Sequence, residues 1–167
     1  RTPAFWIISF GHGFATIVLP AVQVHLGLLM ADEGFRVQTT AWVIAVYTGT
    51  GMVFQIIGGY VGGKIPTRVG LFIFTAIQAT AILLLTAPGS LNTIFLFAVL
   101  LGAGWGGRNP LLVSIRADYF GRTSFGKILG FSTVPMNILM LFSAPFAGYI
   151  RDTRDTYTLA FLALGAL

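Results

Sequence analysis

Apolar stretches, most of them about as long as a bilayer crossing, follow one another along almost the whole chain. They span about 4–30, 41–63, 70–87, 93–114 and 128–150, and a partial one runs from 157 to 167. A helix needs roughly 20 apolar residues to cross a hydrocarbon core of about 30 Å. The pattern predicts an all-α, polytopic membrane helix bundle with five complete transmembrane helices and a truncated sixth. The connections leave no room for a further domain, so residues 1–167 are expected to form one bundle.

The composition agrees with a membrane bundle and argues against several other classes of protein. Apolar residues make up 56% of the chain and charged residues 9%, whereas soluble domains carry about 25% charged residues. Cysteine is absent and the two histidines have no acids close by in the sequence, so no metal site is expected. A glycine-rich run at 102–107 fits a dinucleotide-binding pattern but lies inside an apolar span without a preceding strand. We therefore expect no cofactor.

The basic residues are distributed by topology rather than gathered into a nucleic-acid-binding surface. Of the residues outside the spans, six fall on one side of the predicted membrane and three on the other: Arg1, Lys64, Arg68, Arg116, Arg122 and Lys127 against Arg36, Arg151 and Arg154. Cytoplasmic connections carry the excess of Lys and Arg in membrane proteins. This predicts a multi-pass protein of the cell membrane with a cytoplasmic N-terminus of this segment, contacts with bilayer headgroups and no nucleic-acid partner.

Arg108 is a charged residue inside the fourth span, and such a residue marks a functional site by default because burying its charge in a membrane is costly. Gly102 and Gly106 lie on the opposite side of that helix, where small residues allow close packing. Arg108 and the neighbouring Asn109 are therefore candidates for a substrate path. Two roles stay open for Arg108: contact with an anionic solute, which suits a guanidinium, or a structural bond to headgroups or helix carbonyls.

Other polar side chains form stripes on the helices. His12, Thr16 and Gln23 share one face of the first span at helical spacing. His12 is a candidate for coupling proton binding to solute binding, with a structural hydrogen bond as the alternative. Gln55 in the second span and Asn137 in the fifth are expected either to line the path or to form interhelical hydrogen bonds.

Three segments together resemble the major facilitator superfamily. Arg1-Thr2 with Phe5-Trp6 is similar to the start of the seventh helix of many bacterial members. The run 58–68, GGYVGGKIPTR, resembles the family's cytoplasmic loop signature, and 117–130 resembles the connection between its tenth and eleventh helices. The last segment is most similar to members near the oxalate/formate antiporter and monocarboxylate transporter groups. The resemblance covers the chain as helices seven to eleven and the start of helix twelve.

This resemblance implies a specific architecture. Helices seven and ten would line a central cavity, helix nine would lie on the outside, and a missing N-terminal six-helix half would complete the carrier. It also assigns roles in gating loops to Gly59, Lys64, Arg68, Asp118 and Arg122. The sequence departs from the family in two ways. Gly63 replaces the acid of the loop signature, and the interiors of 41–63 and 128–150 lack the basic residues that bind carboxylates in the oxalate and monocarboxylate carriers.

The sequence thus predicts a secondary active transporter of a small solute, working by alternating access, and not an enzyme. Arg108 suggests an organic anion as the solute, and His12 suggests coupling to protons. Two alternatives remain. One is a standalone small bundle that acts as a channel or dimeric carrier. The other, less favoured, is an intramembrane enzyme, because Asp118 is the one acid in the predicted inner connections.

Overall fold

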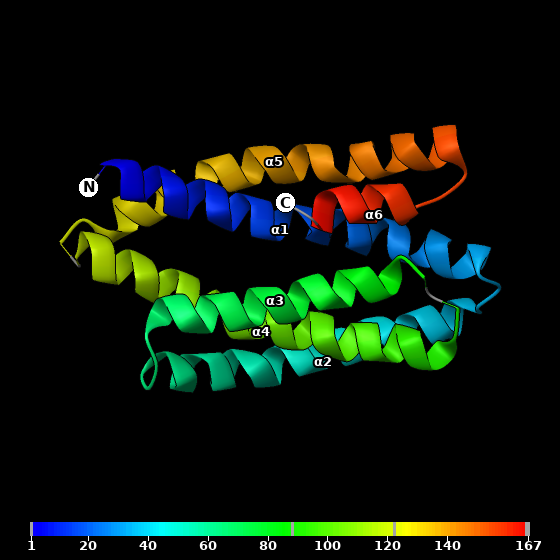
Figure 1. Ribbon diagram of the computed structural model, residues 1–167, viewed down its shortest axis with the longest axis horizontal. Coiled ribbons are helices and arrows are strands. Elements are labelled where there is room, and N and C mark those ends of the chain that lie inside the picture. Colours follow the sequence, from blue (N-terminus) through cyan, green and yellow to red (C-terminus); the bar gives the residue numbers. More distant parts are fainter. Residues whose placement is uncertain (1, 88, 122, 166–167) are drawn as a thin grey trace.

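A computed structural model describes residues 2–87, 89–121 and 123–165. Within these ranges the chain forms helices and no strand (Figure 1). The helices are α1 (Thr2–Asp32), α2 (Val37–Gly62), α3 (Thr67–Leu85), α4 (Leu91–Phe120), α5 (Phe125–Arg154) and α6 (Thr158–Gly165). The first five are long and apolar enough to cross a membrane. The predicted all-α membrane bundle is confirmed.

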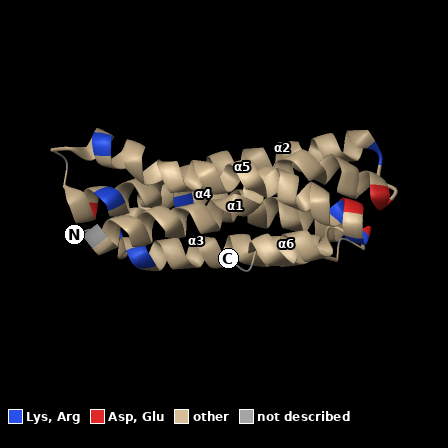
Figure 2. Cartoon of the chain, turned by 90° about the horizontal axis from the view of Figure 1, so that it is seen from above, with Lys and Arg blue, Asp and Glu red and all other residues tan. Residues whose placement is uncertain are grey.

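Most of the charged side chains lie at the two ends of the long helices, and the middle is largely uncharged (Figure 2). We call one end the basic end; it holds the α2–α3 and α4–α5 connections, with Lys64, Arg68 and Lys127. The mixed end holds the other three connections and carries both signs of charge, including Asp32 and Arg151. This segregation follows from the cost of placing charges in an apolar medium.

Helices α1, α4 and α5 extend at both ends beyond the apolar stretches that predicted them, and the extension of α4 corrects an assignment. The fourth apolar stretch ends at 114, but α4 continues to Phe120. Arg116 therefore lies inside a helix and not in an inner connection, and it is 1% exposed. A search for apolar residues ends the predicted span at the first polar residues. The helix itself continues, because its backbone hydrogen bonds do not depend on apolar side chains.

The long helices form two layers. The closest packing joins α4 to α2 and α3, and joins α1 to α5 (Figure 1). We call α2, α3 and α4 the α4 layer, and α1 with α5 the α1 layer. The short α6 contacts α1, α3 and α5. Backbones of α1 and α4 approach each other at few points, so side chains make most of the contact between these two helices.

Glycines explain the close approach of α2 and α4. A Cβ atom placed on Gly106 would lie 2.2 Å from the carbonyl oxygen of Gly51, and one on Gly58 would lie 2.1 Å from that of Gly107. A Cβ on Gly102 would lie 2.3 Å from the carbonyl oxygen of Tyr47. No side chain fits at these distances, so the backbones touch directly. The predicted packing role of Gly102 and Gly106 is confirmed.

The third helix is less isolated than its uniformly apolar sequence indicated. One face of α3 packs on α4 and buries Phe74, Gln78, Ala81, Ile82 and Leu85. The outward face remains exposed, with Phe72 and Leu83 at 75% and 58% exposure. The helix is therefore buried on one side and exposed on the other.

Candidate functional site

Arg108 lies in the middle of α4 and points at α1. Its side chain is 1% exposed. Nη1 donates to the carbonyl oxygen of Ala15 at 2.7 Å, and Nη2 donates to the hydroxyl of Thr16 at 3.1 Å. Its Nε is buried and has no hydrogen-bond partner within the described part of the chain. The guanidinium therefore makes the bond to a helix carbonyl that one of the two sequence alternatives predicted, and retains one unused donor.

Gln78 of α3 joins the same contact and was missed as a site residue. It is 4% exposed, and its Nε2 donates to the carbonyl oxygen of Ala15 at 2.7 Å. Its Oε1 is buried without a partner among the described residues. The sequence did contain a signal for this contact, since Gln78 is the one strongly polar side chain in the most apolar span. Polar groups in lipid are retained where they bond to another helix.

Arg116 is a second buried arginine, and its three nitrogens contact three different helices. Nε donates to the hydroxyl of Ser132 in α5 at 2.7 Å, and Nη1 donates to the carbonyl oxygen of Leu112 in its own helix at 2.6 Å. Nη2 donates to Nδ1 of His12 in α1 at 2.8 Å. The sequence interpretation missed this role because it placed Arg116 outside the membrane.

We call His12, Thr16, Gln78, Arg108, Arg116 and Ser132 the arginine cluster. Every acceptor that its guanidiniums use is neutral. Among the described residues, the ion pairs all involve Arg151 at the mixed end, so neither arginine of the cluster pairs with a carboxylate. A guanidinium stays protonated in proteins. The cluster therefore holds two uncompensated positive charges inside the bundle.

A cavity of about 190 Å³ lies beside the cluster, between α1, α3 and α4. His12 and Arg108 form part of its wall, and Thr75 adds a hydroxyl. The remaining wall is mainly aliphatic, including Ile8 and Leu112. The cavity wall beside Arg108 is thus mostly apolar, which strengthens the electrostatic influence of that charge compared with a site in water.

The other predicted path residues do not join this cluster. Gln23 is exposed, and its Nε2 donates to the hydroxyl of Tyr47 in α2 at 3.2 Å. Gln55 and Asn137 are exposed, and Asn109 is half-buried. In the described part of the chain, no side-chain hydrogen bond joins Gln55, Asn109 or Asn137 to another helix. The structure brings together His12, Thr16 and Arg108, and leaves the other four apart.

The residues assigned to gating loops lie mostly on helix ends. Gly59 is inside α2, Arg68 is in the first turn of α3, and Asp118 is near the end of α4. Thr67 donates to Asp118 at 3.0 Å, and Arg68 donates to the hydroxyl of Tyr119. These contacts tie the start of α3 to the end of α4. Lys64 lies in the connection, 5.7 Å from the centre of the Tyr60 ring. Arg122 lies outside the described residues.

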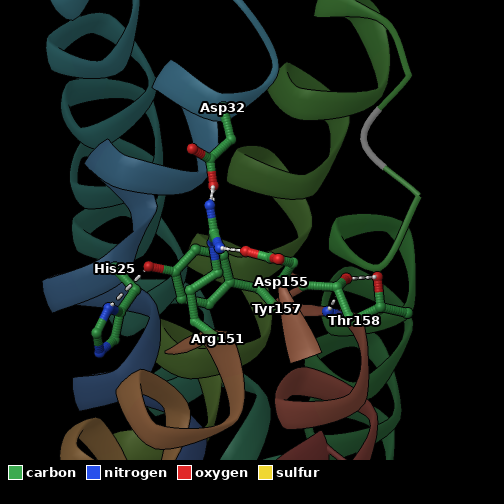
Figure 3. Close-up of polar contacts among 7 residues, drawn as sticks. His25, Asp32, Arg151, Asp155, Tyr157 and Thr158 are labelled. Carbon is green, nitrogen blue, oxygen red and sulfur yellow. Dashed lines mark hydrogen bonds and ion pairs between the residues drawn. The ribbon is translucent and has the colours of Figure 1, made fainter. Parts of the chain in front are cut away.

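A separate polar group at the mixed end holds the α1 layer together (Figure 3). Arg151 of α5 pairs with Asp32 of α1 at 3.0 Å and with Asp155 at 2.7 Å. His25 contacts the hydroxyl of Tyr157 at 3.2 Å through Nδ1 and the carbonyl oxygen of Ala144 at 3.0 Å through Nε2. Both ring nitrogens of His25 are therefore used in packing.

Long apolar helices with charges buried between them define a polytopic membrane protein. The family model described as Major Facilitator Superfamily matches residues 2–167. The chain belongs to this superfamily of membrane transporters, which confirms the resemblance on 58–68 and 117–130.

Two curated proteins are similar to most of the chain. Monocarboxylate transporter 13 of Rattus norvegicus is 26% identical over 145 residues, which cover 86% of this chain and 34% of that protein. Monocarboxylate transporter 13 of Bos taurus has the same identity and coverage. The chain thus spans about a third of the length of these relatives.

Proposed function

We propose that this chain forms the second six-helix half of a secondary active transporter that moves a small organic anion by alternating access. The observation that carries the proposal is the arginine cluster, where Arg108 and Arg116 are each 1% exposed and use only neutral acceptors. Uncompensated buried cations raise the affinity of the interior for an anion, because the bound charge offsets part of their desolvation cost.

The relatives support the type of anion. They are named monocarboxylate transporters, and a carboxylate is the group whose geometry a guanidinium matches best. Arg108 retains an unused buried Nε–H. In the proposed mechanism the cluster supplies positive potential to the central cavity, and a change in conformation exposes Arg108 to the solute. A monocarboxylate is therefore the first substrate to test.

The proposed partner is an N-terminal six-helix half. The helices α2 and α5 expose apolar side chains along most of their length, among them Met52, Ile56, Phe131, Leu141 and Phe142. Such surfaces suit lipid and a second bundle alike. A second copy of this chain, as in a dimeric carrier, is the competing occupant. Size measurement of the complete carrier in nanodiscs separates the two.

The basic end is proposed to face the cytoplasm. With Arg116 moved into α4, the sequence count of flanking basic residues becomes five against three: Arg1, Lys64, Arg68, Arg122 and Lys127 against Arg36, Arg151 and Arg154. The bias retains its direction under the positive-inside rule.

Binding of short monocarboxylates to purified complete carrier tests the proposed function. Arg108→Gln should weaken binding by about 2 kcal/mol or more, roughly thirtyfold, because a buried charge pair with the anion is lost. Arg108→Lys keeps the charge without the fork and should weaken binding less. Arg154→Gln, an exposed cation at the mixed end, is the matched control. Equal affinity in wild type and Arg108→Gln, normalised to folded protein, would refute the proposal.

A further inference from the structure

The contact between Arg116 and His12 determines the protonation state of the histidine. A guanidinium has five N–H donors and no acceptor. Nη2 of Arg116 lies 2.8 Å from Nδ1 of His12, so Nδ1 must be the acceptor. The imidazole is therefore neutral, with its proton on Nε2. A proton added to Nδ1 would remove the acceptor and place two cations against each other.

The groups around His12 offer nothing that would stabilise an added proton. From α4, the charged groups are Arg116 and Arg108, both positive. From α3, Leu71 and Thr75 line the cavity that His12 also lines, and neither titrates. From α5, Ser132 reaches the cluster through its bond to Arg116. No described carboxylate pairs with either arginine. A proton on His12 and the bond to Arg116 therefore exclude each other.

We propose that Nδ1 of His12 is a proton-binding site, and that proton binding there releases Arg116. The His12–Arg116 contact is then a proton-sensitive latch between the α1 layer and the α4 layer. The latch rests on the proposed function in one respect, because its coupling to transport requires that the carrier alternate between conformations. This deepens the sequence hypothesis for His12 by naming the group with which the proton competes.

The latch matters because a single side chain, Arg116, joins both layers. Arg116 bonds from α4 to α1 through His12 and to α5 through Ser132. Closest helix packing occurs within each layer and not between α1 and α4. Release of one side chain thus frees two interhelical bonds at once. The α1 and α4 helices can then move apart near Arg116, because their backbones make little direct contact.

Linkage gives the direction and size of the effect. The latched form binds no proton at His12, whereas the released form leaves Nδ1 free to take one up. The ratio of released to latched protein should therefore rise as the pH falls, by up to tenfold for each unit of pH. Above about pH 7.5 the ratio should be constant, because neither form takes up a proton at this residue.

Electron–electron distance measurement in the complete carrier tests the latch directly. The chain has no cysteine, so spin labels can be placed at Val113→Cys in α4 and Phe131→Cys in α5, both exposed positions beside the latch. In wild-type background a longer distance should gain population between pH 7.5 and 4.5. His12→Gln keeps a neutral acceptor for Arg116 and should hold the latched distance at every pH. Arg116→Gln should show the released distance at every pH.

His25→Gln is the matched control, because His25 lies on the same helix at the mixed end and bonds to Ala144 and Tyr157. It should leave the pH response intact. An unchanged distance in wild type down to pH 4.5, or the same response in His12→Gln, would overturn the latch. Loss of the response in His25→Gln would overturn it too. The distances are measured without solute, so weak or absent anion binding would count against the proposed function alone.

Discussion

Arg108 of α4 and Gln78 of α3 donate to one and the same acceptor, the backbone carbonyl oxygen of Ala15 in α1, each at 2.7 Å. A helix carbonyl has a second lone pair beyond the one that its own helix uses. Here that capacity joins three helices at a single atom. The α1 and α4 layers are thus connected at their centre by polar side chains that belong to otherwise apolar helices.

Gln78→Leu removes one of these two donors and is expected to lower stability moderately. Interhelical hydrogen bonds in membranes contribute about 0.6–2 kcal/mol, and the replacement also removes the buried, unpartnered Oε1. We expect a loss near the lower end of that range, with anion affinity retained because Arg108 stays in place. Thermal unfolding in detergent measures it. Thr80→Ala, whose hydroxyl bonds only within α3, is the control, and equal stability of both variants would contradict the bridging role.

Gly106→Ala should disrupt the α2–α4 interface. Its Cβ would lie 2.2 Å from the carbonyl oxygen of Gly51, which is backbone and has no rotamer through which to move away. Overpacking of this kind costs about 1–3 kcal/mol or more. Gly49→Ala in α2 is the matched control, since nothing lies within 4 Å of its added Cβ. Monodisperse yield and melting temperature should fall for the first variant only, and a fall of the same size in both would point to a general intolerance of helix substitutions.

Cysteine labelling checks the proposed orientation. Ser124 at the basic end and Asn92 at the mixed end are both exposed. A membrane-impermeant thiol reagent applied to intact cells should label Asn92→Cys and not Ser124→Cys, because the positive excess marks the cytoplasmic side. In inverted vesicles the pattern should reverse. Labelling of Ser124→Cys from outside would place the basic end on the outer side of the membrane.

Asp118→Asn is expected to change transport rate more than solute affinity. Asp118 accepts a hydrogen bond from Thr67 at 3.0 Å at the basic end, and in the described part of the chain it makes no bond to the arginine cluster. Asn keeps an acceptor for Thr67 but removes the charge, and Thr67→Val keeps the charge but removes the bond. Initial uptake rates and Km of both variants distinguish a charge-based gate from a packing contact. A raised Km with an unchanged maximal rate would argue for a role in solute binding instead.

The sequence predicted the helices and their number and named Arg108, His12 and Thr16 as candidate site residues, because helical periodicity and the rarity of charges in lipid are local properties. It missed Arg116 and Gln78 for different reasons. Arg116 follows a stretch whose apolar count had already ended, so the helix boundary was drawn too early. The partner of Gln78 is a backbone carbonyl on another helix, and backbone acceptors leave no mark in a sequence.

The sequence by itself determined that the chain is a membrane bundle, since residues that are costly to solvate in lipid are confined almost entirely to the helix ends. It also indicated that the fourth span packs closely on a neighbour, because Gly102 and Gly106 leave its backbone uncovered. The structure identified α2 as that neighbour. Only the tertiary structure decided which residues share the interior with Arg108. His12, Arg116 and Ser132 come from three helices, and their contacts depend on the rotation and offset of those helices. Those quantities are set by packing across the whole bundle and not by any local pattern.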